Sequence, residues 1–362
     1  MHIAKRFAPD AAAVEPLPGG NINETFCVTR ADGSRFVLQK LSRTVFPDPA
    51  AILANLRTIN RHIHAKLAGG RDAHGPWRQP RSIPTVDGAD FFEDSGGFCW
   101  RALTFVEGAT AWPSLRDLSH ARQIGFALGR FQSLLSDLAP DALLDTLPGF
   151  HVTPGYLAAF DRASASAEAR ARRAGCAECD AMMRFIDAER PRASVLEDAL
   201  ARGDLRLRPT HGDPKASNVM IDDASRRAVA MIDLDTTKPG LIHYDFGDCI
   251  RSLCNPAGEE PDDPSAAHVD LDALREAAAG YIGRARDFLT AADYALLFDS
   301  IRLIAFELSL RFFTDYLDGD RYFRVFFPGQ NLRRATVQRI LCEDIVRKEG
   351  AIRGFLDDLA AR

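Results

Sequence analysis

The sequence lacks the features that would place the protein in a membrane, outside the cell or on a nucleic acid. No apolar run reaches the roughly 18 residues that a membrane-spanning helix needs, so we expect no membrane partner. The opening residues, MHIAKRFAPD, lack the apolar core of a secretory signal, which predicts a cytoplasmic protein. Basic residues are not in excess either. The chain has 45 Lys and Arg against 50 Asp and Glu, a balance that indicates no nucleic-acid partner.

Cysteine is scarce and scattered. The seven cysteines are an odd number without regular spacing, which argues against the disulfide framework of a small secreted protein. Cys176 and Cys179 form a C-x-x-C pair, but neither a second pair nor nearby histidines follow to complete a zinc site. The surrounding sequence, ARARRAGCAECDAMMRF, is typical of a helix. We therefore expect two reduced thiols without a special role.

The sequence does have the composition of a globular protein, with 362 residues of which 46% are hydrophobic and 26% charged. Its length favours two domains. The stretch TFCVTRADGSRFVLQKL predicts two strands joined at Asp32-Gly33, and GADFFEDSGGFCWRALTFVEG predicts a second hairpin. Residues 48–70 show helical spacing between them, and most of the remaining chain is helical in pattern. We predict an α+β protein with a small antiparallel-sheet lobe, residues 1–106, and a larger helical lobe, residues 107–362.

One short segment combines the groups that phosphoryl transfer requires. His211-Gly212-Asp213 is followed by Asn218 and then by a strand that ends in MIDLD, which contains Asp233. Transfer from ATP needs a carboxylate that orients the attacking hydroxyl and accepts its proton, and oxygen ligands for Mg²⁺. Asp213 fits the first task, and Asn218 and Asp233 fit the second. The alternative is a loop whose Asp and Asn only form turns, but that reading does not explain the whole pattern.

Several stretches resemble a known superfamily. HGDPKASNVMID and IDLDTTKPGLIHYDFGD look like the catalytic core of the aminoglycoside phosphotransferase and choline kinase superfamily. GGNINETF, FVLQKLSRTVFPDP and RFFTDYLDGDRYF are most similar to the N-acetylhexosamine 1-kinases, and the resemblance covers nearly the whole chain. It implies a two-lobed protein-kinase-like fold, ATP and Mg²⁺ as cofactors, and transfer of the γ-phosphate to the anomeric hydroxyl of an N-acetylhexosamine.

Two alternatives stay open at this point. One is a kinase of the same fold that acts on another alcohol, such as an aminoglycoside, an amino alcohol or a different sugar. The other is a catalytically silent nucleotide-binding module, which is disfavoured because Asp213, Asn218, Asp233 and Lys40 are all present. The sequence does not indicate which hexosamine is preferred, which residue reads its acyl group, the pathway or the oligomeric state.

The triplet Asp245-Phe246-Gly247 has the letters of the magnesium triplet of protein kinases. The superfamily resemblance instead makes Asp233 the counterpart of the magnesium aspartate, so the triplet is a look-alike. Asp245 is then expected to brace the catalytic loop through hydrogen bonds. Asp235 and Asp248 could either line the sugar pocket or hold the loop.

The resemblance also places the nucleotide. Lys40 ends the V-L-Q-K stretch, which resembles the kinase V-A-I-K, and would reach the α- and β-phosphates. Gly19 and Gly20 would let the backbone of a phosphate loop come close. Phe105 and Val106 belong to a hinge-like segment whose backbone would pair with adenine. The helix that follows the lysine contains no acidic residue, so whether Lys40 has an acidic partner stays open.

For the acceptor, the resemblance places Arg311 and Tyr322 in the sugar site. Arginine can donate paired hydrogen bonds to hydroxyl or amide oxygens. Asn21 and Asn23 could also contact sugar hydroxyls, and Asp213 would bind the reacting hydroxyl. The alternative readings are a structural ion pair for Arg311 and a core aromatic for Tyr322.

Overall fold

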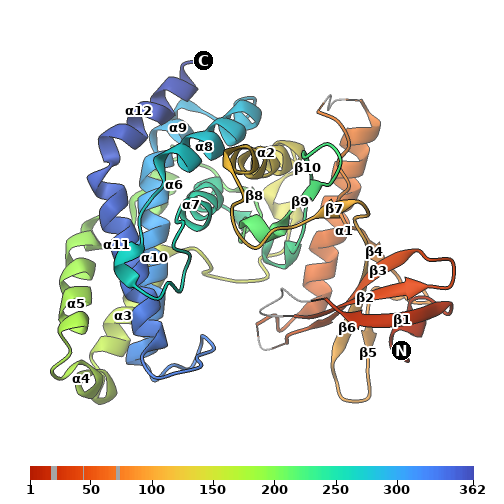
Figure 1. The fold of residues 1–362 in the computed structure, drawn as a ribbon, viewed down its shortest axis with the longest axis horizontal. Helices are drawn as coiled ribbons and strands as arrows, with labels where there is room; N and C mark the ends of the chain where they lie inside the picture. Colours follow the sequence, from red (N-terminus) through yellow and green to blue (C-terminus); the bar gives the residue numbers. More distant parts are fainter. Residues whose placement is uncertain (18–22, 44, 71–73) are drawn as a thin grey trace.

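A six-stranded antiparallel sheet and a larger helical body lie side by side in the computed structural model (Figure 1). The structure describes residues 1–17, 23–43, 45–70 and 74–362. The expected fold class, a small sheet lobe followed by a mainly helical lobe, is confirmed. Gly19, Gly20 and Asn21, which we expected to bind nucleotide or sugar, lie outside the described residues.

Strands of the first lobe pair in the order β1-β2-β3-β6-β4, and β5 pairs with β6. One face of this sheet is apolar. Phe36 and Leu38 on β3 pack there with Val28 and Ala102, under the N-terminal turn η1. The intervening residues of β3 point to the opposite face, because successive side chains of a strand alternate. The elements are η1 (Ala4–Arg6), β1 (Ala11–Pro16), β2 (Glu24–Arg30), β3 (Arg35–Leu41), β4 (Ser82–Ile83), β5 (Phe92–Glu93) and β6 (Cys99–Thr104).

Local signals explain the turn and the helix that the sequence predicted in this lobe. The turn between β2 and β3 contains Gly33 at φ +85°, and Asp32 Oδ1 accepts a hydrogen bond from Ser34 N at 2.9 Å. Helix α1 (Pro49–Ala68) begins after Asp48, whose side chain accepts from Ala51 N at 3.1 Å. Its buried residues recur at helical spacing and contact the core of the second lobe.

A second, three-stranded sheet connects the lobes to the catalytic segment. Strand β7 (Ala109–Thr110) pairs with β9 (Val219–Asp222), which pairs with β10 (Ala228–Met231). β8 (Arg208–Thr210) and β11 (Lys238–Gly240) pair as a separate two-stranded ladder, and residue 211 follows directly after β8. The strand that the sequence predicted up to MIDLD is β10, whereas β7, β8 and β11 were not predicted, since two or three residues show no periodicity. The predicted lobe boundary after residue 106 falls between β6 and β7.

The second lobe is built around helices α2 and α8, which cross closely. A Cβ on Gly125 would lie 1.9 Å from Ala277 O, and one on Gly280 would lie 2.0 Å from Arg122 O, so only glycine permits this approach. No helix of the described residues is long and apolar enough to cross a membrane. The helices are α2 (Leu118–Leu135), α3 (Thr153–Ser164), α4 (Ala167–Arg173), α5 (Ala177–Glu189), α6 (Val195–Ala201), α7 (Ile242–Leu253), α8 (Leu271–Ala285), α9 (Ala291–Ala295), α10 (Leu297–Leu317), α11 (Gln330–Arg347) and α12 (Glu349–Ala360).

The C-x-x-C pair differs from the expectation. The structure joins Cys176 and Cys179 as a disulfide, with the two Cα atoms 5.2 Å apart. Cys176 is the N-cap of α5, and its Sγ accepts a hydrogen bond from Cys179 N at 3.1 Å. This cap places the two side chains over the same first turn, a position that the helical pattern alone did not reveal. The expectation of two reduced thiols is therefore corrected.

Candidate active site

The catalytic loop starts directly after β8 with a buried histidine. His211 Nδ1 accepts a hydrogen bond from Asp213 N at 3.2 Å, and Nε2 lies 3.0 Å from the carbonyl oxygen of Ile232. These partners fit a neutral ring that carries its proton on Nε2. Burial lowers the pKa of His211, which favours the same neutral form. His211 therefore shapes the loop and is not a proton carrier.

Asp245 braces this loop, as predicted. On α7, its Oδ2 accepts from His211 N and its Oδ1 from Gly212 N, both at 2.8 Å. Gln132 on α2 donates a further hydrogen bond to Oδ2 at 2.8 Å. Gly212 has φ +85°, and a Cβ there would lie 2.8 Å from Thr236, so the tight turn requires glycine. The Asp-Phe-Gly triplet is thus part of a buried helix that holds the loop.

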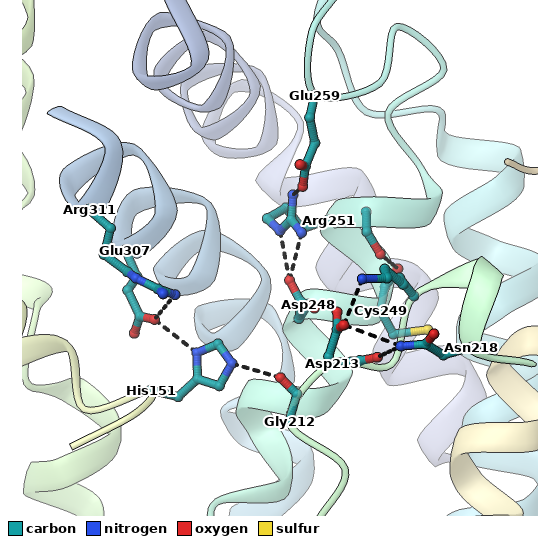
Figure 2. Close-up of polar contacts among 12 residues, drawn as sticks. His151, Gly212, Asp213, Asn218, Asp248, Cys249, Arg251, Glu259, Glu307 and Arg311 are labelled. Carbon is teal, nitrogen blue, oxygen red and sulfur yellow. Dashed lines mark hydrogen bonds and ion pairs between the residues drawn. The ribbon is translucent and has the colours of Figure 1, made fainter. Parts of the chain in front are cut away.

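Asp213 carries a carboxylate that is both hydrogen-bonded and partly open to solvent. Its Oδ2 accepts from Lys215 Nζ at 2.7 Å and from Asn218 Nδ2 at 3.2 Å. Asn218 Nδ2 also donates to the backbone oxygen of Asp213 at 2.8 Å, so Asn218 is locked against the same residue (Figure 2). Within the part of the chain that the structure describes, Asn218 Oδ1 has no hydrogen-bond partner. Lys215 was not among the residues predicted from the sequence, although it lies two residues after Asp213.

Asp233 follows β10 in the left-handed conformation, with φ 63°. Solvent reaches its side chain, which makes no hydrogen bond or ion pair to any described residue. Partial loss of hydration beside the protein, together with the negative charges of Asp235 and Asp213, raises the pKa of Asp233 above its ordinary value. An unpaired carboxylate among other acids is what a bound cation would stabilise.

The donor set fits Mg²⁺. Asn218 Oδ1 and the Asp233 carboxylate are hard oxygen ligands without a partner in the described residues, and the cation keeps other positions for water and phosphate oxygens. No cluster of three or more His, Cys, Asp or Glu that could hold a metal occurs among the described residues. Magnesium in phosphoryl-transfer sites is usually held by one or two protein ligands, and phosphate oxygens and water fill its other coordination positions. Two protein ligands, Asn218 and Asp233, agree with this pattern.

Asp235 ties the turn that carries Asp233 to the sheet of the first lobe. Arg101 on β6 is buried, and its Nη1 lies 2.6 Å from Asp235 Oδ1. Nε and Nη2 of Arg101 both donate to Gln39 Oε1, at 3.0 and 2.7 Å. We call Arg101, Gln39 and Asp235 the lobe clamp. Of the two roles left open for Asp235, the structure supports the one of holding the loop.

Asn23 belongs to the same network. Its Nδ2 donates to Asp235 Oδ2 at 2.8 Å, and its Oδ1 accepts from Ser42 N at 3.0 Å. Both ends of the amide therefore already have protein partners, and the side chain is buried. This placement does not favour the expected contact between Asn23 and a sugar hydroxyl.

The lobe clamp gives a stability prediction. Arg101→Ala should lower the free energy of unfolding by about 3–5 kcal/mol, because it leaves Asp235 buried and without its countercharge. Arg57 and Asp90 form a matched ion pair whose side chains are exposed. Arg57→Ala should therefore change the free energy of unfolding by only about 0–1 kcal/mol. Urea denaturation followed by circular dichroism measures both, and equally small effects would contradict the clamp.

Lys40 lies on the other face of β3. Its Nζ is 2.9 Å from Glu24 Oε1 on the adjacent strand and 3.7 Å from the centroid of the Phe98 ring. Lys40 and Gln39 point in opposite directions, and Gln39 is the one that reaches Arg101. The acidic partner that the sequence left open is therefore Glu24. The placement does not favour the expected contact of Lys40 with the phosphates, which would require the pair with Glu24 to break.

The hinge-like segment has a free backbone. No N–H or C=O of Phe105 or Val106 forms a hydrogen bond to another described residue. The side chain of Val106 is buried against Val229 and Ala230, and the guanidinium of Arg35 lies 4.2 Å from the centroid of the Phe105 ring. The expected pairing of this backbone with adenine remains a prediction, and the free groups are consistent with it.

In the region where the acceptor is expected to bind, the side chain of Arg311 on α10 is surrounded by three aromatic rings. Its guanidinium lies 5.4, 4.9 and 5.6 Å from the ring centroids of Phe150, Tyr156 and Phe323. The nearest acid is Glu307, at 3.7 Å from Nη1 (Figure 2). The guanidinium makes no hydrogen bond to another described residue, so its N–H groups remain free for a ligand.

Tyr322 lies close to the aromatic rings around Arg311, but its side chain is not part of the hydrophobic core. Its side chain is 67% exposed, which excludes the reading as a core aromatic. Its ring contacts Phe323 edge to face at 4.8 Å, and its N–H donates to Asp315 Oδ1 at 2.8 Å. Phe323 therefore connects Tyr322 to Arg311. The assignment of both residues to a sugar site stays a prediction.

Asp248 is held by an arginine instead of facing a ligand. Its Oδ1 accepts from Nε and Nη2 of Arg251, both at 2.8 Å, and Arg251 Nη1 reaches Glu259 Oε1 at 2.9 Å (Figure 2). Burial acts to raise the pKa of Asp248, but the positive charges of Arg251 and His151 hold it below its ordinary value. The structure therefore supports the reading that Asp248 holds the loop.

The two lobes and the braced Asp-Asn loop between them define a kinase-like phosphotransferase. Residues 13–281 match the model of the phosphotransferase enzyme family, and the chain belongs to that family. Among solved structures, it is similar to a microcompartment-associated aminopropanol kinase, with a TM-score of 0.64, 16% identity and coverage of 97% of this chain and 98% of the other.

Two further structures show the same fold. An aminoglycoside phosphotransferase from Alicyclobacillus acidocaldarius matches with a TM-score of 0.60, 14% identity and coverage of 99% of this chain and 96% of the other. The amicoumacin kinase hAmiN, solved with AMP-PNP, Ca²⁺ and Ami, matches with a TM-score of 0.57, 12% identity and coverage of 95% and 88%. At these identities the similarity establishes the fold and does not establish the acceptor.

Proposed function

We propose that the protein is an ATP- and Mg²⁺-dependent kinase of a small molecule that transfers the γ-phosphate to the anomeric hydroxyl of an N-acetylhexosamine, GlcNAc or GalNAc. The observation that carries the proposal is the loop in which Lys215 and Asn218 both donate to Asp213, close to Asp233. This loop supplies a base, two metal ligands and a cation, which are the parts that phosphoryl transfer from ATP to an alcohol requires.

Each residue of the loop has a separate task in this proposal. Asp213 accepts the proton of the acceptor hydroxyl and orients its oxygen. Asn218 and Asp233 would hold Mg²⁺, which when bound neutralises charge on the phosphates. Lys215 is a cation beside Asp213 and would face the transferred phosphoryl group. Asp245 keeps the loop in place through the two backbone N–H groups of His211 and Gly212.

The nucleotide would lie between the sheet and this loop. The free backbone of Phe105 and Val106 would pair with the adenine edge. Gly19 and Gly20 stay predicted parts of a phosphate loop. The neighbour solved with AMP-PNP and Ca²⁺ has the same fold, which is consistent with binding of a nucleotide and a divalent metal by this chain.

The acceptor end favours a neutral sugar over an amine. Arg311 is a fixed positive charge whose N–H groups are free within the described residues, and three aromatic rings surround it. A cationic aminoglycoside or amino alcohol would meet repulsion there, whereas the hydroxyl and amide oxygens of an N-acetylhexosamine can accept its hydrogen bonds. The rival is a kinase of the same fold for an amino alcohol or an aminoglycoside, as two neighbours are by description.

The product tests the proposed acceptor. Phosphorus NMR should show the new phosphate coupled to the proton on C1, and the sugar should lose its reducing end. Coupling to the C6 protons, or a product that still reduces copper, would identify a 6-kinase.

Arg311→Ala should raise the KM for the sugar strongly and leave the KM for ATP nearly unchanged, since only acceptor binding is lost. Arg275, an exposed arginine over the Phe355 ring, is the matched control, and Arg275→Ala should change neither constant.

A further inference from the structure

His151 lies in a strained position between the acceptor end and the catalytic loop. It precedes α3 and adopts the left-handed conformation with φ 56°, which a residue with a side chain rarely occupies. Such strain persists only where the surroundings hold the residue firmly, and it often marks functional sites. The ring is largely enclosed, stacked on Tyr244 at 5.5 Å with an interplanar angle of 15°.

Both ring nitrogens of His151 face oxygen acceptors. Nδ1 is 2.8 Å from Glu307 Oε1, and Nε2 is 3.1 Å from the carbonyl oxygen of Gly212 (Figure 2). A carbonyl oxygen only accepts, and so does an ionised carboxylate. Arg311 Nη1 lies 3.7 Å from Oε1 of this carboxylate, and Thr153 Oγ1 donates to its Oε2 at 2.7 Å, so positive charge and a hydrogen-bond donor face Glu307. Both nitrogens must then donate, which requires the doubly protonated imidazolium.

The charged and titratable groups around His151 support this form. Burial acts to lower the pKa of His151, but Glu307, through its charge and hydrogen bond, and Asp248 raise it above its ordinary value of 6.5 in spite of Arg311. The facing groups are Glu307 and Arg311 of α10, Asp248 and Tyr244 of α7, Tyr156 of α3, and Glu197 of α6 behind Tyr244.

The contacts of His151 connect the catalytic loop, which contains Asp213, with helix α10, which carries Arg311. Gly212 is held from both sides, because its N–H donates to Asp245 and its C=O accepts from His151. The next residue along the chain is Asp213, the proposed base. On the other side of the ring, Glu307 is one helical turn from Arg311, the proposed acceptor contact. Thr153 Oγ1 holds the second oxygen of Glu307 at 2.7 Å.

We propose that His151 is a positioning residue which, as an imidazolium, aligns the acceptor-binding end of α10 with the loop of Asp213, so that turnover depends on the charge of His151. This inference rests on the proposed function, because it assigns Asp213 as base and Arg311 as acceptor contact. Deprotonation removes one of the two donors and leaves either Glu307 or Gly212 without its partner, which loosens the geometry between acceptor and base.

The test is the pH profile of kcat with saturating MgATP and the best alcohol found. In the wild type, kcat should fall as pH rises through the raised pKa of His151. Glu307→Gln removes the carboxylate that stabilises the imidazolium, so this alkaline limb should move to lower pH. His151→Gln should lower kcat by roughly 10- to 100-fold and abolish the limb. His62, which pairs with Asp137 at 2.9 Å, is the matched control, and His62→Gln should keep the wild-type profile.

A second readout needs no turnover. Nitrogen NMR of the histidine rings distinguishes imidazolium from neutral imidazole. The His151 signal, identified by its shift in Glu307→Gln and its loss in His151→Gln, should stay protonated at both nitrogens at neutral pH. A neutral ring there, or an unchanged alkaline limb in both variants, would overturn the proposal. If no alcohol is phosphorylated, the proposed function fails, while the NMR titration still decides the state of His151.

Discussion

Asp213→Asn is expected to lower kcat by roughly 10²- to 10⁴-fold, which is the usual contribution of a general base, with little change in the affinity for MgATP. The amide keeps the size of the carboxylate and can still accept hydrogen bonds from Lys215 and Asn218. It cannot accept a proton from the acceptor hydroxyl at neutral pH. The loss should therefore fall on the chemical step, measured as steady-state ADP release together with calorimetric binding of MgATP.

The control for this variant is Asp223→Asn. Asp223 is an exposed acid of the turn between β9 and β10, and it accepts a hydrogen bond from Thr110 Oγ1 at 2.8 Å. Its replacement changes the net charge in the same way without touching the loop, so turnover should stay at the wild-type level. Near wild-type turnover of Asp213→Asn would refute the assignment of the base.

Asp233→Ala and Asp245→Ala should fail in different ways. Asp233 is a proposed Mg²⁺ ligand, and its side chain makes no hydrogen bond or ion pair with the described residues. Its removal should therefore abolish activity and weaken MgATP binding without unfolding the protein. Asp245 is buried and accepts three hydrogen bonds, from His211, Gly212 and Gln132. Its removal leaves these donors unsatisfied and should lower the melting temperature along with the activity.

Calorimetry with MgATP and thermal unfolding of the two variants separate the roles. The magnesium dependence of binding should be lost in Asp233→Ala and retained, per folded molecule, in Asp245→Ala. If Asp245→Ala loses magnesium binding and Asp233→Ala keeps it, the two carboxylates have been assigned in the wrong order.

The sequence predicted the site best where its residues lie close together along the chain. Asp213, Asn218 and Asp233 stand at a spacing that a loop and a short hairpin bring together, so their proximity follows from nearby residues alone. The bracing role of Asp245 was also predicted, but from the superfamily resemblance and not from its spacing. The turn at Gly33 and the N-cap at Asp48 have equally local causes.

The parts that the sequence missed depend on long-range contacts or on the face of a strand. Gln39 and Lys40 are adjacent on β3, so their side chains point to opposite faces of the sheet. An error of one residue in the predicted strand therefore reverses which of the two faces the site. Arg101 meets Asp235 only because β6 and the turn after β10 come together across the lobes. His151 has no local pattern, and its two partners come from α10 and from the catalytic loop. No periodicity in one sequence reveals such pairs.

The most direct test of the central claim is ADP release from MgATP by the purified protein over a panel of acceptors. The panel contains N-acetylglucosamine, N-acetylgalactosamine, their parent sugars, an aminoglycoside, ethanolamine and aminopropanol, with a control that lacks acceptor. The account predicts Mg²⁺-dependent release that requires an acceptor, is fastest with an N-acetylhexosamine and is lost in Asp213→Asn. Turnover only on an amine-bearing alcohol would move the acceptor to the rival class. Binding of MgATP without acceptor-dependent release on any compound would contradict the claim that this site is a working phosphotransferase.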